Sequence, residues 1–266
     1  MIKKTLGSVY INYFKSNNRL ERIWKIAQVD FKKRYYNDKA GLLWALINPI
    51  TQILLYHFVF TKILQKDQEN FVPYLFSGIL IWLSFTEATK KGMQVFTHKK
   101  YLIENIQFDW KDLYISHMFS ISFGLAFNFL AYLIILMFIG ANIGDHFIYL
   151  PIILLTWFIL TLGITMILGI IRPVIDDIVH IWSLLLLVGF WVSGIFFSGT
   201  FYFENYTWFP HVNPLVGIVL NIRGCLLENN PFFLNMMIEN FIYAVCLFMI
   251  ALFLFKKYSK KVVERI

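Results

Sequence analysis

The chain has 266 residues, of which 58% are hydrophobic, 19% aromatic and only 15% charged, and its mean hydropathy is +0.62. Too little polar surface remains to face water, so the composition excludes an ordinary soluble domain, a disordered chain and a disulfide scaffold. The apolar residues fall in blocks of roughly 16 to 25, the length that crosses about 30 Å of hydrocarbon at about 1.5 Å per residue. The composition therefore predicts an integral membrane protein.

Residues 1–41 are polar and basic, and we expect them to form a cytoplasmic N-terminal segment. Within this segment, residues 20–31 place apolar side chains at helical spacing, Trp24 and Phe31 among them, and charged side chains on the other faces. The pattern predicts an amphipathic helix on the membrane surface. Two interpretations stay open: the helix is a basic membrane anchor, or it is a docking surface for a cytoplasmic partner.

Six apolar runs, bounded by charges, glycine and proline, predict six transmembrane helices and an all-α fold. We expect residues 42–256 to form one six-span membrane domain and residues 257–266 to form a basic cytoplasmic tail. The predicted spans are 42–61, 71–88, 115–139, 149–171, 181–198 and 240–255.

The positive charges indicate the orientation of these spans. Of the 24 Lys and Arg residues, all but Lys62, Lys66 and Arg223 fall on the side of the two termini. The positive-inside rule therefore places both termini in the cytoplasm. This topology and anionic lipid explain the net charge of +8, so the charge gives no support to a nucleic-acid partner.

Polar and aromatic side chains within the spans are candidates for a transport path. A polar group in lipid usually bonds to a neighbouring helix, and aromatic rings usually gather in belts at the membrane interface. Both kinds of residue can instead line a water-filled path, where ring faces suit sugars. The candidates for such a path are Tyr56, His57, Phe190, Trp191, Phe196 and Phe197.

The segment 91–111, between the second and third spans, is too long for a tight turn and carries apolar side chains. These side chains need a surface to pack against. They lie on the membrane or on the chain's own helices, or they insert into a cytoplasmic subunit.

The segment 200–234, between the fifth and sixth spans, is expected to be external and contains a short apolar stretch at 215–227. That length is typical of re-entrant or interfacial segments. Its polar members Asn221 and Arg223 indicate that one side faces water or protein.

Motifs for catalysis and metal binding are missing from the sequence. It contains no Gly-rich phosphate loop, no His-Glu-x-x-His and no Gly-x-Ser-x-Gly. We therefore expect no nucleotide-hydrolysing or other catalytic site in this chain, and no metal site. Asp176 and Asp177, with Arg172 nearby, are interpreted as a local ion pair or helix cap, because further metal ligands are not evident.

Several short motifs follow one another along the chain. They are Val-Asp-Phe-Lys-Lys-Arg-Tyr at 29–35, Gly-Leu-Leu-Trp at 41–44, Asn-Pro at 48–49, Pro-Tyr-Leu-Phe-Ser-Gly-Ile-Leu-Ile-Trp at 73–82, Ser-Gly-Ile-Phe-Phe at 193–197 and Asn-Pro at 213–214. As an ordered set they resemble the permease subunits of bacterial ABC exporters for lipid-linked polysaccharide, of the O-antigen, capsule and teichoic-acid type. The chain departs from that family at Phe108-Asp109, where Phe-Pro is frequent, and at Ala40, where Leu is usual.

The resemblance implies a homodimer of six-span subunits in the bacterial inner membrane, with a continuous channel at the dimer interface. It implies two copies of a separate ABC ATPase, which would bind ATP and Mg in place of this chain. Segment 91–111 would be the main coupling helix, and residues 20–35 the interface helix. The implied ATPase contacts are Trp24, Phe31, Lys99, Tyr101, Leu102, Ile103 and Phe108.

The resemblance also implies that the external segment 201–227 forms gate helices. The residues singled out there are Phe201, Tyr202, Trp208, Asn213, Pro214 and Arg223.

The resulting hypothesis is a permease for undecaprenyl-linked polysaccharide, with O-antigen as the favoured cargo. Two alternatives stay open. The first is export of teichoic acid or another cargo by the same fold. The second is an integral-membrane enzyme acting on a lipid carrier, for which Asp176, Asp177 and His180 are the nearest candidates.

Overall fold

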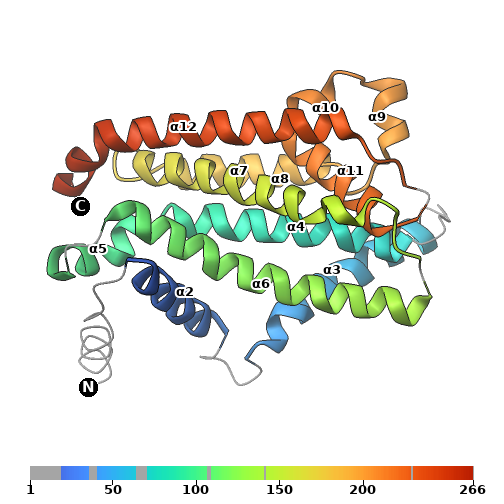
Figure 1. Ribbon diagram of the computed structural model, residues 1–266, viewed down its shortest axis with the longest axis horizontal. Coiled ribbons are helices and arrows are strands. Elements are labelled where there is room, and N and C mark those ends of the chain that lie inside the picture. Colours follow the sequence, from blue (N-terminus) through green and yellow to red (C-terminus); the bar gives the residue numbers. More distant parts are fainter. Residues whose placement is uncertain are drawn as a thin grey trace.

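The computed structural model describes residues 19–35, 41–63, 71–106, 109–140, 142–228 and 230–265. Within these ranges every regular element is a helix (Figure 1), which confirms the predicted all-α class. The helices are α2 (Arg19–Tyr35), α3 (Leu43–His57), the π-helix η1 (Phe58–Ile63), α4 (Phe71–Gly92), α5 (Val95–Ile106), α6 (Trp110–Ile139), the 3-10 turn η2 (Phe147–Tyr149), α7 (Leu150–Ile171), α8 (Ile178–Val192), α9 (Gly199–Asn205), α10 (Phe209–Val212), α11 (Pro214–Leu226) and α12 (Leu234–Arg265).

Five helical segments in the described part of the chain are long and apolar enough to cross a membrane, so the chain is a multi-pass membrane protein. They correspond to the first, second, third, fourth and sixth predicted spans. The segments are Leu43–Ile63, Phe71–Gly92, Trp110–Ile139, Phe147–Ile171 and Leu234–Ser259.

The fifth predicted span, 181–198, has a different structure from the one expected. Its helix, α8, has 15 residues and ends at Val192, so it is about 22 Å long at about 1.5 Å per residue, shorter than the hydrocarbon core. The chain turns at Gly194, which has a φ of 83°. A left-handed backbone favours glycine, so the sequence ends the helix at this point. The six-span count stays a prediction.

The last helix is longer than predicted. α12 continues from Leu234 to Arg265, through most of the stretch predicted as a separate tail. Lys and Arg have high helix propensity, so a basic stretch extends a helix that has already formed.

α4 forms the centre of the bundle, with α3, α6, α7 and α8 packed around it. Its side chains are buried almost continuously from Phe71 to Trp82, apart from Val72. α12 packs along α7, where Gly163 permits close approach: a Cβ there would lie 3.1 Å from the backbone nitrogen of Phe248. The hydrophobic core therefore runs along the whole bundle.

The two ends of the bundle carry different short elements (Figure 1). α2, α5 and the end of α12 lie at one end, which we call the α5 end. α9, α10 and α11 lie toward the other end, which we call the α9 end.

α2 confirms the predicted amphipathic helix, and part of its predicted apolar stripe is buried. Ile23, Ile26 and Ala27 are buried, and the helix packs against α6. Trp24 is 47% exposed, although it belongs to the predicted apolar stripe.

Candidate functional site

Ion pairs join the predicted interface helix to the bundle at the α5 end. The Arg34 Nε atom of α2 lies 3.1 Å from Glu87 Oε1 of α4, and Lys91 Nζ lies 2.7 Å from the same oxygen. Arg34 also donates to the Ser120 hydroxyl of α6 at 3.3 Å. One arginine therefore links three helices.

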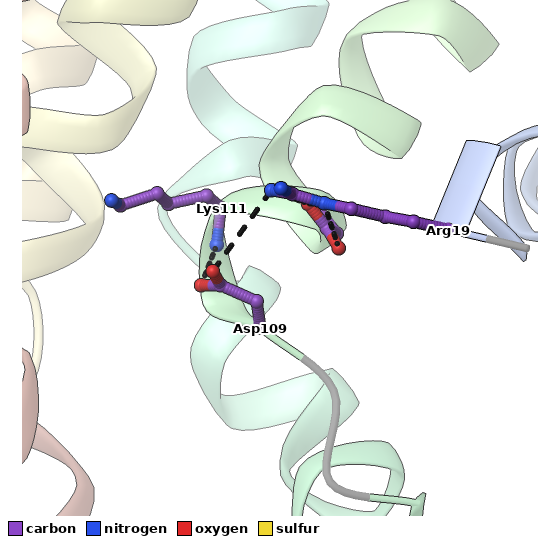
Figure 2. A network of polar contacts seen from close by, with 4 residues as sticks. Arg19, Asp109 and Lys111 are labelled. Atoms are coloured by element: carbon purple, nitrogen blue, oxygen red, sulfur yellow. Dashed lines mark hydrogen bonds and ion pairs between the residues drawn. The ribbon is translucent and has the colours of Figure 1, made fainter.

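A second contact joins the beginning of α2 to the beginning of α6 (Figure 2). Arg19 donates from Nη2 to Asp112 Oδ1 at 2.6 Å and from Nε to both carboxylate oxygens at 3.0 Å. The hydrogen bond to Asp112 raises the pKa of the Arg19 guanidinium above its ordinary value. Asp109 caps α6 by accepting from the Lys111 backbone amide at 3.1 Å and lies 4.0 Å from Arg19. The cap explains why the third span begins five residues before its predicted start.

The predicted coupling residues lie at the α5 end, and the structure describes only some of their side chains. Lys99 of α5 is 13% exposed and pairs with Asp30 of α2, so its ammonium points toward the bundle. Tyr101, Leu102 and Ile103 belong to α5, but their side chains are outside the described set, and Phe108 lies outside the described residues.

On α2, Trp24 and Phe31 both contact the ring of Phe123 in α6, with centroid distances of 5.1 and 6.0 Å. α2 and α5 are thus joined to each other and to the membrane helices.

Four predicted path residues form one aromatic cluster. Tyr56 lies 5.5 Å from Phe190 and 5.2 Å from Phe196, and Trp191 stacks on Phe196 at 5.1 Å. The sequence analysis missed Phe60, which stacks on Phe196 at 5.2 Å. Phe60 follows Tyr56 by four residues, so helical spacing from Tyr56 could have identified it.

The other two path candidates lie outside this cluster. His57 contacts Phe71, with ring centroids 6.4 Å apart. Phe197 stacks on Phe201 at 4.6 Å and therefore belongs with the predicted gate residues.

Arg223 of α11 is 1% exposed and reaches a set of backbone carbonyls. It donates to Ile195 at 2.6 Å and to Gly194 at 2.7 Å, with longer bonds to Tyr74 and Phe197. Its guanidinium carbon lies 3.4 Å from the centroid of the Tyr74 ring. The sequence predicted that the side of α11 with Arg223 faces either water or protein, and the structure shows that it faces protein.

The remaining gate candidates surround this contact at the α9 end. Asn213 caps α11 by accepting from the Leu215 amide at 3.2 Å, with Pro214 as the first helical residue. Tyr202 stacks on Phe209 at 5.7 Å, and burial raises the pKa of its hydroxyl to about 12. Trp208 is 61% exposed. The predicted gate residues therefore contribute to one packed unit built on α11, with an exposed rim.

Residues 21–227 match the family described as ABC-2 type transporter. The chain belongs to the ABC-2 type transporter family. The matched region runs from α2 to the end of α11 and includes the α5 end, the aromatic cluster and the Arg223 contact.

Individual relatives of this ABC-2 chain are distant but cover most of its length. It is 25% identical over 210 residues to the O-antigen export system permease protein RfbA of Myxococcus xanthus, covering 77% of this chain and 79% of that one. It is 21% identical over 204 residues to the protein of the same name from Klebsiella pneumoniae, covering 76% and 79% of the two chains.

Potential catalytic or metal-binding groups of this transporter chain are dispersed. In the described residues, no three His, Cys, Asp or Glu side chains are placed to hold a metal ion. Arg172 pairs with Asp176, which confirms the predicted local ion pair. The family is one of transporter permeases, so its members act by moving a cargo.

Proposed function

We propose that the chain is the membrane permease subunit of an ATP-driven exporter of undecaprenyl-linked polysaccharide, with O-antigen as the cargo. The family match over residues 21–227 carries this proposal, together with relatives named as O-antigen export permeases. The proposed location is the bacterial inner membrane, with six crossings and both termini in the cytoplasm.

The proposed glycan path lies between two copies of the chain. α8 presents a broad apolar face: Leu184, Leu187 and Val188 are each more than 60% exposed, and Leu186 is the buried residue of this helix. Such a face needs lipid or protein against it. The aromatic cluster includes Phe190 and Trp191 of α8, and Trp191 is 53% exposed. A path at a two-fold interface would therefore receive one aromatic wall from each copy.

The proposed ATPase contact is the α5 end. α5 is joined to α2 through Lys99 and Asp30, and α2 is joined to α4 and α6 through Arg34. A push on α5 would therefore be transmitted to the helices that support the path. ATP and Mg would be bound and hydrolysed by the partner subunits, and this chain would supply no catalytic group.

The test is to co-express the chain with the ATPase encoded beside it and to purify the pair in detergent. We expect two copies of each subunit, with ATP hydrolysis that increases when lipid-linked glycan is added. A chain that purifies alone would contradict the proposal, and lipid-carrier chemistry in that preparation would favour a membrane enzyme. Stimulation by teichoic acid instead of O-antigen would keep the permease and change the cargo.

A further inference from the structure

A polar pocket opens between α2, α3, α4 and α6, within the membrane part of the fold. Its volume is about 470 Å³, and its wall includes charged and amide side chains as well as apolar ones. It is distinct from the aromatic cluster, since no member of that cluster is among its lining residues. Such a pocket in a membrane bundle suggests a ligand with a polar and an apolar part.

One end of the pocket carries a net positive charge. Arg34 and Lys91 line it, and both pair with Glu87. Among the described residues that line this end, two cations and one carboxylate sum to one positive charge, which matches a phosphodiester with one negative charge. A pyrophosphate carries more negative charge than this group neutralises. The Arg34 side chain is only 9% exposed, so its charge is largely shielded from water.

Thr86 and Asn128 also line the pocket, and each has a buried side-chain oxygen without a hydrogen-bond partner in the described part of the chain. These atoms are the Thr86 hydroxyl oxygen and the Asn128 Oδ1 atom. An amide can rotate to exchange its oxygen and nitrogen, so Asn128 can present a donor at this position. Thr86 can donate as well. Buried polar groups of this kind normally have partners, and ester carbonyls would supply them.

The rest of the wall is apolar and partly open. Leu83, Ile121 and Leu125 line it, and the ring of Trp44 is 46% exposed. Acyl chains leaving the pocket would contact these side chains and continue into the surrounding lipid.

We propose that this pocket binds a diacyl glycerophospholipid with one net negative charge. Its phosphate lies against Arg34 and Lys91, its ester carbonyls accept from Thr86 and Asn128, and its acyl chains leave past Trp44. The lipid fills the space between α3 and its neighbours. Only 17% of the α3 span is buried inside the protein, so a bound lipid would stabilise the position of this helix. The inference does not depend on the identity of the exported cargo.

The test measures lipid retention by the full chain in detergent, using native mass spectrometry with dioleoyl phosphatidylglycerol and dioleoyl phosphatidylethanolamine. We expect the wild-type chain to bind phosphatidylglycerol about fivefold more tightly, because both lipids carry one phosphate charge but the positive end of the pocket repels the ammonium group of phosphatidylethanolamine. Lys91→Gln should remove this preference. Lys90→Gln is the matched control, because Lys90 is the exposed neighbouring residue and does not line the pocket.

A second pair of variants tests the ester contacts. Thr86→Val and Asn128→Leu should weaken both lipids about equally, since both lipids carry the same esters. Lys91 is exposed and Thr86→Val conserves volume, so these changes should leave the fold intact, which elution volume on gel filtration would check.

Two outcomes would overturn the proposal. In the first, both lipids bind equally and Lys91→Gln behaves as Lys90→Gln does. In the second, undecaprenyl pyrophosphate binds more tightly than phosphatidylglycerol and displaces it from the wild-type chain. That result would assign the pocket to the lipid carrier.

Discussion

Arg223 illustrates how a buried charge can be held without a carboxylate. Its guanidinium donates to carbonyls of α4 and of the turn that follows α8, so it joins three parts of the chain that are distant in sequence. The five N–H donors of arginine, in a fixed plane, suit such a set of acceptors, whereas lysine offers a single point charge. The residue therefore positions α11 against α4 and against the turn that follows α8.

We predict that Arg223→Lys lowers the thermal stability of the purified chain by the equivalent of about 2 to 4 kcal/mol, because several buried carbonyls lose their donors. Thermal unfolding in detergent measures this. Arg172→Lys is the control, since the exposed Arg172–Asp176 pair should contribute less than about 1 kcal/mol. Equal stability of the two variants would contradict the positioning role.

Trp191 has the largest exposed fraction in the aromatic cluster, and in the proposed path it would contact the glycan. We predict that Trp191→Ala reduces export by about fivefold, the loss of about 1 kcal/mol of ring contact, while the ATPase complex still forms. Export of O-antigen to the cell surface is the measurement. Phe253→Ala on α12 is the matched control, because that ring is 64% exposed and lies outside the cluster. An equal loss in both variants would exclude a specific path role.

At the scale of elements, α2 and α5 behave as one unit. The Lys99–Asp30 pair joins them, and Arg19 and Arg34 anchor α2 at its two ends. Arg19 bonds to α6 and Arg34 pairs with α4, so both ends of α2 are attached to the bundle. A force on α5 would therefore be transmitted through α2 to α4 and α6. In the proposed complex, the ATPase would bind to the outer surface of α5.

We predict that Leu102→Asp and Ile103→Asp abolish co-purification of the ATPase, because a charge on an apolar docking surface costs several kcal/mol when buried. Pull-down of the ATPase measures the effect. Val212→Asp supplies the control at the α9 end, where the side chain is 66% exposed. If the α5 variants keep the ATPase, the coupling role of α5 is wrong.

At the scale of the whole molecule, the apolar faces of α3 and α8 remain uncovered. The α4 span is 78% buried, whereas the α3, α12 and α6 spans are 17%, 22% and 33% buried, so the bundle has a closed centre and apolar surface on several outer helices. In the proposed homodimer we expect the second copy to pack against the uncovered apolar face of α8.

We predict that Leu187→Cys forms a disulfide between two copies in membranes, in a chain whose exposed Cys246 is replaced by serine. Leu187 is 68% exposed on α8. Ile134→Cys on α6, 54% exposed, should stay monomeric on a non-reducing gel. A dimer through Ile134 and none through Leu187 would place the interface on another face.

The amino-acid sequence alone determined the class of this protein, five of its spans and the amphipathic α2. These properties depend on composition and on apolar periodicity, which are local. It also identified the local Arg172–Asp176 pair, since four residues on one helix are neighbours. The predicted end of the fifth span at residue 198 was wrong, because α8 ends at Val192. The glycine at position 194 was a sequence signal for a turn there.

Only the tertiary structure decided which distant residues meet. The contact of Arg223 with Tyr74 spans 149 positions, and that of Arg34 with Glu87 joins helices separated by α3. The polar pocket beside Glu87 draws its wall from four helices. Such sites depend on how helices pack against one another, and packing is a property of many side chains together that no local pattern records.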